Sequence, residues 1–123
     1  MPATQPPSRA QLPHADRDLQ EWYLGRLSYL AGRLNPYVEG EPQSSRRLRA
    51  LMAMEVFSLP AALRIGLKAA EADLRDERVP QHLGGQMQDL REAVAETRLV
   101  PLLVKGLGVS YILGEEHQRA LLG

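Results

Sequence analysis

The residues best placed to do chemistry in this 123-residue chain are the serines and arginines of "SSRRLR", residues 44–49. Serine is a favoured helix cap, so a helix is expected to start at one of the two serines. Cationic side chains are unfavourable at that end of a helix, by about 0.3–1 kcal/mol each, unless an anion lies there. The predicted contacts to a phosphate or an acidic partner segment are Ser44, Ser45, Arg46, Arg47 and Arg49. The alternative is that the arginines are solvated or pair with Glu39 and Glu41.

Glu55 is the best candidate for carboxylate chemistry. If the helix continues past residue 52, its geometry puts Glu55 inside the apolar face that Leu48 and Val56 share. A carboxylate there must form an ion pair, stay protonated or line a cavity. Catalytic carboxylates usually act with a second acid or base, and none is evident here. We therefore expect Glu55 to pair with an arginine of a neighbouring helix, such as Arg26, and we assign no catalytic residue.

Metal and cofactor chemistry has little support in the sequence. His14, His82 and His117 lie far apart and have no partner at metal-ligand spacing. The chain contains no cysteine, which excludes disulfide scaffolds, cysteine nucleophiles and thiolate metal sites. We expect no metal and no cofactor.

The stretch "PLLVKGLGVSYILGEEH", residues 101–117, looks most like a motif. Gly106 and Gly108 could begin a dinucleotide-binding fingerprint, but the next glycine is Gly114 and no strand precedes them. The pattern predicts a short apolar helix over residues 102–107, ended by these glycines, with one or two further turns near the C-terminus.

Part of this stretch, "LVKGLGVSYILGEE", is similar to the closing segment of helix-turn-helix domains of the lambda-repressor type. The similarity covers fourteen residues and implies a DNA-reading helix upstream. The upstream sequence "VPQHLGGQMQDLREAVAETRLVP" does not have the family's order, and its acidic residues would repel phosphate. The chain is therefore not identified as a member. The alternative function is a nucleic-acid-binding transcriptional regulator that contacts phosphates through Arg46, Arg47 and Arg49.

Leucines and alanines at three- and four-residue spacing predict the elements that hold these residues. Helices are expected over residues 16–34, from 44 or 45 to about 56, from about 59 to 78, and from residue 80 onward. Residues 1–14 hold four of the nine prolines and are interpreted as a flexible N-terminal arm. We predict an all-α fold, a single-domain bundle of four to six helices over residues 15–123.

Four of the six aromatic residues lie on or just after the first predicted helix. Aromatic side chains near the edge of an apolar stripe are common interface anchors, and they are as common in cores. The predicted interface residues are Trp22, Tyr23, Tyr29 and Tyr37. A small domain this rich in leucine could bury the excess against a second copy, so a homodimer is expected.

The formal net charge is zero, so no overall field attracts nucleic acid or an anionic membrane. From Glu41 to Ala70, however, the sequence contains five basic residues and only two acidic ones. No apolar run is long enough for a membrane span, and no signal peptide is evident. We expect a cytoplasmic, bacterial-type, non-enzymatic binding protein, an adaptor, regulator or assembly factor that acts through protein–protein contacts.

Overall fold

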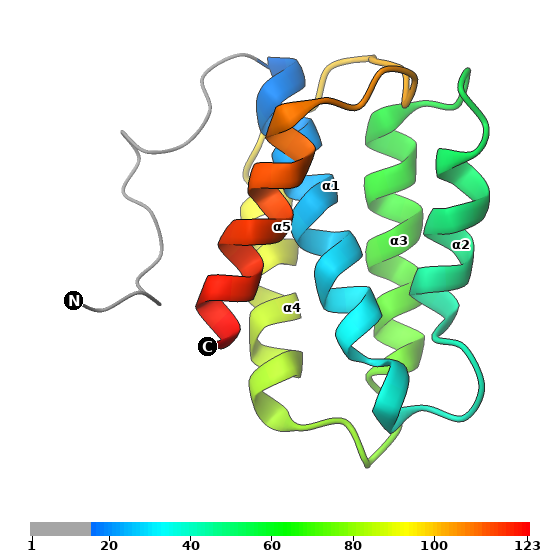
Figure 1. Ribbon diagram of the computed structural model, residues 1–123, viewed down its shortest axis with the longest axis vertical. Coiled ribbons are helices and arrows are strands. Elements are labelled where there is room, and N and C mark those ends of the chain that lie inside the picture. The colour runs from blue at the N-terminus through cyan, green and yellow to red at the C-terminus, as the bar shows by residue number, and fades with distance from the viewer. Residues whose placement is uncertain (1–15) are drawn as a thin grey trace.

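The protein is an all-α, single-domain bundle, as the leucine spacing predicts (Figure 1). A computed structural model describes residues 16–123, and the predicted arm over residues 1–14 lies outside this range. The described residues form five α-helices and one short 3-10 helix: α1 (Asp16–Arg33), η2 (Asn35–Tyr37), α2 (Gln43–Met52), α3 (Leu59–Asp73), α4 (Gln81–Ala95) and α5 (Val109–Leu122). None of these helices is long and apolar enough to cross a membrane.

Helix α1 is the central element of the bundle. It packs against α2, α3, α4 and α5, most extensively against α5, and in Figure 1 it lies between α5 and the α2–α3 pair. Leu24, Leu27 and Leu30 of this helix are almost completely buried. At Gly66 of α3 a Cβ atom would lie only 2.8 Å from side-chain carbons of Leu27 and Leu48, so this glycine lets three helices meet.

The second helix is shorter than the sequence predicts. It ends at Met52, and a turn leads to Ser58, whose hydroxyl accepts a hydrogen bond from the Ala61 N–H and caps α3. Pro60 lies in the first turn of α3, where its missing N–H costs no helical hydrogen bond. The prediction for Glu55 is wrong because the helix has ended before this residue, and its side chain is exposed in the turn.

The apolar helix expected over residues 102–107 is absent, and this segment contains no helical residue and turns at Lys105 and Gly106. Its backbone pairs with the α2–α3 turn: Leu59 N–H donates to Leu102 O (2.7 Å), and Val104 N–H donates to Phe57 O (2.8 Å). A proline at the start of a helix does not prevent it, so the helix is absent because these tertiary hydrogen bonds outweigh the propensity of the leucines. Gly106, with φ of 78°, belongs to the turn before α5 and does not end a helix.

The last helix is a 14-residue element where only one or two turns were expected. It lies directly on α1, because glycines remove the side chains at the contact. A Cβ on Gly25 would lie 2.0 Å from Tyr111 O, and a Cβ on Gly114 would lie 2.1 Å from Trp22 O. The backbones of α1 and α5 therefore touch at these two positions.

Candidate binding surfaces

The outer face of α3 separates two grooves. Arg64, Lys68 and Glu71 follow one another at helical spacing along this face. The groove between α3 and α4 has a volume of about 490 Å³, and Arg91 of α4 lies on its far side. Its apolar lining comes from Leu67, Val94, Ala95 and Leu99. This groove therefore combines an apolar surface with charged edges.

The second groove lies between α2 and α3 and has a volume of about 420 Å³. Arg47 of α2 and Arg75, just after α3, line it with Lys68 and Glu71, which also line the first groove. Its apolar lining comes from Ile65, Ala69 and Ala72. The two grooves are thus adjacent and share the charged ridge of α3.

Positive charge is concentrated around these two grooves, which we call the cationic grooves. Their cations are Arg47, Arg64, Lys68, Arg75 and Arg91. The only acid in their lining is Glu71, so five positive charges against one negative charge leave a net charge of +4 there, in a chain whose formal net charge is zero. Glu71 forms a 2.7 Å ion pair with Arg91, so the net charge of +4 comes from the other four cations.

An acidic side chain of the same protein lies at the N-terminus of α2. The buried carboxylate of Asp73, at the end of α3, accepts hydrogen bonds from Gln43 N–H (2.7 Å), Ser44 N–H (2.9 Å) and the Ser44 hydroxyl (2.6 Å). The N–H groups at the start of α2 therefore already have an anionic acceptor within the protein. Sequence spacing gave no sign that a residue 29 positions away would supply it.

The other predicted anion contacts of α2 lie apart from this cap. Arg46 and Arg47 are exposed, and Ser45 is half-buried. Arg49 is also exposed and forms a bidentate ion pair with the Glu41 carboxylate. The hydrogen bond from Arg49 lowers the pKa of the Glu41 carboxyl. Of the predicted set, only Arg47 lines a cationic groove.

The aromatic residues of α1 are divided between core and surface. Trp22 is 6% exposed and Tyr23 is 4% exposed, so both are core residues and are not available to a partner. The Tyr23 hydroxyl is 3.1 Å from the hydroxyl of Thr97. Tyr29 and Tyr37 are half-buried, and they are the only predicted interface aromatics that reach the surface.

A chain of buried polar side chains joins three helices. Arg26 of α1 donates to the Gln118 side-chain oxygen of α5 (2.8 Å), and Gln118 donates to the Gln86 side-chain oxygen of α4 (3.0 Å). Arg26 therefore has a partner other than the predicted Glu55, and burial lowers the pKa of its guanidinium. The side-chain nitrogen and oxygen of Gln20 are also buried, and neither makes a hydrogen bond to any of residues 16–123.

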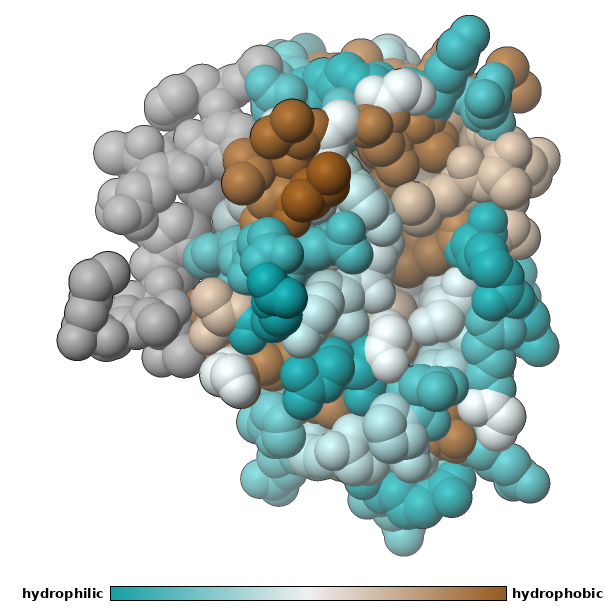
Figure 2. Space-filling model, viewed as in Figure 1, coloured by the Kyte–Doolittle hydropathy of each residue, from teal (hydrophilic) through white to brown (hydrophobic). Residues whose placement is uncertain are grey.

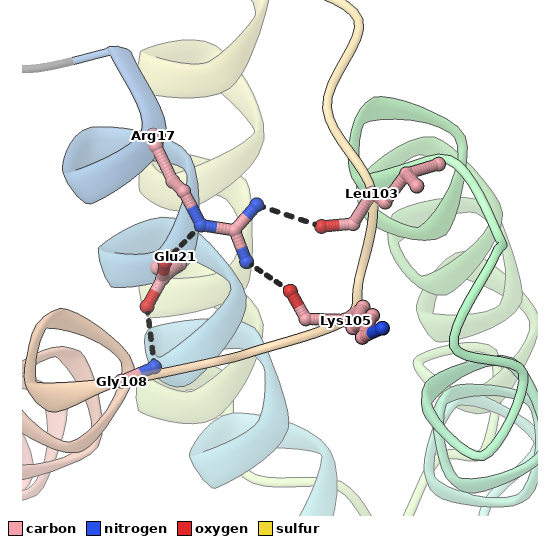
Figure 3. A network of polar contacts seen from close by, with 5 residues as sticks. All are labelled: Arg17, Glu21, Leu103, Lys105 and Gly108. Atoms are coloured by element: carbon pink, nitrogen blue, oxygen red, sulfur yellow. Dashed lines mark hydrogen bonds and ion pairs between the residues drawn. The ribbon is translucent and has the colours of Figure 1, made fainter.

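A second polar cluster fixes the segment that leads into α5 (Figure 3). The Arg17 guanidinium donates to the carbonyl oxygens of Leu103 (2.9 Å) and Lys105 (2.5 Å). It also forms a 2.7 Å ion pair with Glu21, which accepts a hydrogen bond from Gly108 N–H (2.7 Å). These contacts replace the backbone hydrogen bonds that a helix would have provided, so their role is structural.

An apolar stripe on α5 faces outward. Val109 is 69% exposed, Ile112 is 56% exposed and Leu113 is 54% exposed, and their spacing puts them on one side of the helix. We call these three residues the α5 stripe. A hydrophobic patch covers the first turns of this helix in Figure 2. The sequence signal was present as i, i+3 and i+4 spacing, but the segment was not interpreted as a full helix.

The histidines do not form a common site. His82 is exposed on α4, and His14 lies outside the described residues. The His117 ring lies 4.9 Å from the Trp22 ring, its Nε2 atom is buried without a partner, and burial together with the charge of Arg26 lowers its pKa. Among residues 16–123, no three His, Asp or Glu side chains gather closely enough to hold a metal ion.

Comparison with protein-family models, with curated proteins and with solved structures finds no match to this chain.

Proposed function

We propose that this protein is a non-enzymatic binding protein that recognises an acidic, amphipathic segment of a partner protein in its cationic grooves. The observation that carries the proposal is the concentration of five cations around two grooves in a chain of zero net charge. Such a patch attracts an anionic partner although the whole protein has no net field. The absence of cysteine suits a reducing compartment, and we propose a cytoplasmic location.

The grooves favour a peptide segment over a nucleic acid backbone. Leu67, Val94 and Leu99 give the groove between α3 and α4 an apolar surface, which suits the apolar face of a helix or an extended segment. Arg64 and Lys68 at its edge suit carboxylates on the other face of that segment.

The position of α3 also disfavours duplex DNA. Helix α3 is flanked by α2 and α4 across the two grooves, and most of its residues are buried. A helix that reads DNA must enter a major groove about 12 Å wide and therefore protrudes from its domain. The cations beside α3 line concave grooves, which fit a single narrow segment.

The proposal is tested by titrating isotope-labelled protein with three probes in an NMR experiment. The probes are a short amphipathic helical peptide with glutamate opposite leucine, the same peptide with lysine in place of glutamate, and a short DNA duplex. We expect only the acidic peptide to shift backbone amides along residues 64–75 and 91–99. Preferential binding of the duplex would favour the nucleic-acid-binding alternative, and equal binding of both peptides would refute the role of charge.

Variants locate the contact. Replacing Arg64 and Lys68 with serine removes two exposed cations of the ridge and should weaken the acidic peptide about tenfold. The matched control replaces Arg33 and Lys105 with serine, which removes the same residue types from exposed positions outside the grooves. Equal weakening by both pairs would mean that binding follows net charge and not this site.

A further inference from the structure

The α5 stripe is the largest group of exposed apolar side chains on any single helix of the described residues. We infer that this stripe is the contact face of a homodimer in which α5 packs antiparallel against α5 of a second copy. Three large apolar side chains at 54–69% exposure on adjacent turns are unfavourable in water and mark a contact face. This inference does not depend on the proposed function of the cationic grooves.

Antiparallel pairing makes the stripe self-complementary. A two-fold axis beside Ile112 brings this side chain against its own copy, as an isologous contact requires. Val109 then lies near Leu113 of the partner subunit, so that all three apolar side chains lose water together. Small helical pairs of this kind place their axes about 8–10 Å apart.

Charge complementarity supports the same arrangement. The α-helical rise of about 1.5 Å per residue puts Glu116 and Gly108 each about 6 Å from Ile112 along α5, on opposite sides. In the antiparallel pair Glu116 is therefore level with the partner's Gly108, the residue that precedes the first turn of α5. Gly108 N–H donates to Glu21, and within residues 16–123 no side chain caps the turn that follows. Glu116 forms an exposed ion pair with Arg119 of its own helix, and such exposed pairs contribute little to stability. A carboxylate near the N–H groups at a helix N-terminus is favourable, and symmetry supplies this contact twice.

The stripe is available because α5 is attached to the bundle by its other face. That face packs on α1 through Gly114 and joins Arg26 through Gln118. Helices α5 and α3 both pack on α1 and make no extensive contact with each other. A dimer through α5 therefore leaves the cationic grooves of both copies open, so the assembly would present two copies of that surface.

The first experiment measures the mass in solution by light scattering during gel filtration. We expect the wild-type chain to have twice its 13.7 kDa mass at high micromolar concentration. Ile112→Asp should weaken the dimer at least about a hundredfold and give a monomer. The matched control is Val56→Asp in the α2–α3 turn. Val56 is 79% exposed, more than the 56% of Ile112, and the Val56→Asp variant should remain a dimer. Circular dichroism verifies that both variants remain helical.

A wild-type monomer would overturn the inference, and so would a dimer that Val56→Asp dissociates while Ile112→Asp does not. A second experiment tests the register directly. The chain has no cysteine, so Ile112→Cys is the only thiol in its variant. With helix axes about 8–10 Å apart and Cα atoms about 2.3 Å from each axis, the two thiols near the two-fold axis lie in disulfide range.

Mild oxidation should therefore cross-link the Ile112→Cys variant in high yield and leave a Val56→Cys variant mainly uncross-linked. If the wild-type chain is a dimer but Ile112→Cys does not cross-link, the copies meet through another surface and the inference is wrong.

Discussion

Replacing Gly114 with alanine tests the close packing on which the position of α5 depends. The added Cβ would lie 2.1 Å from Trp22 O, whereas ordinary contact begins near 3.4 Å, so the atoms must separate by roughly 1.3 Å, the difference between these distances. The obstacle is a backbone carbonyl inside α1, which cannot rotate away as a side chain could. Helix α5 must therefore move outward or tilt.

Two opposing effects, helix propensity and overpacking, determine how much Gly114→Ala changes the free energy of unfolding. Alanine is better than glycine in a helix interior by about 1 kcal/mol. Overpacking at a well-packed contact costs about 1–3 kcal/mol, and a rigid backbone neighbour puts this position at the upper end of that range. We expect Gly114→Ala to lower the free energy of unfolding by about 2 kcal/mol, which corresponds to a fall of about 8 °C in the melting temperature for a chain of this size.

The assay is urea and thermal unfolding followed by circular dichroism, with Gly85→Ala as the matched control. Gly85 also lies inside a helix, α4, but a Cβ there meets no atom within 4 Å. Its replacement should raise the free energy of unfolding by about 1 kcal/mol, because only the propensity term acts. If Gly114→Ala proves as stable as Gly85→Ala, helices α1 and α5 do not meet at these glycines and the described packing is refuted.

Three further tests, with four substitutions between them, address the buried polar groups. Asp73→Ala should lower the free energy of unfolding by about 3 kcal/mol and Ser44→Ala by about 1 kcal/mol, and a double-mutant cycle should show coupling; additive effects would contradict the contact. Gln20→Met should raise the free energy of unfolding by about 1 kcal/mol in urea unfolding, because two buried atoms without partners are removed; a loss of stability would show that they have partners. Because burial and Arg26 lower the pKa of His117 below 6.5, its contribution to stability should be complete above about pH 6.5 and decrease as the pH falls below that value. The free energy of unfolding should fall less between neutral pH and about pH 5 for His117→Phe than for the wild type. An equal fall in both proteins would exclude His117 as the cause of the pH dependence.

Sequence reasoning succeeded where one pattern determined both the helix and its buried face. In α4, Leu83, Met87, Leu90 and Val94 recur at helical spacing, and all four are buried. The start of α3 was also predictable, because Ser58 caps the helix and Pro60 fits its first turn. These features depend on neighbours within one or two turns, which a single sequence displays directly.

The errors come from contacts between residues far apart in the chain. The segment over residues 102–107 has strong helical propensity, but Arg17 bonds its carbonyl groups across 86 and 88 residues and the α2–α3 turn pairs with its backbone. The cap of α2 by Asp73 has the same origin. Helix ends and caps that such contacts determine leave no local pattern. The end of α2 before Glu55 and the contact of Ser44 with Asp73 therefore could not be predicted.

The full length of α5 was not predicted for a different reason: its large apolar residues are exposed, and a small and a polar residue are buried. A surface helix normally buries its large apolar residues and exposes its polar ones. In α5 the buried residues are Gly114 and Gln118, whereas Val109, Ile112 and Leu113 are exposed. Gly114 is buried because two backbones touch, and Gln118 is buried because it bonds Arg26, while Tyr111 and Leu122 pack on the core only partly buried and the α5 stripe stays outside. A monomer gains nothing from an exposed apolar face, but a second α5 packed against it does, which is why the inversion favours the dimer.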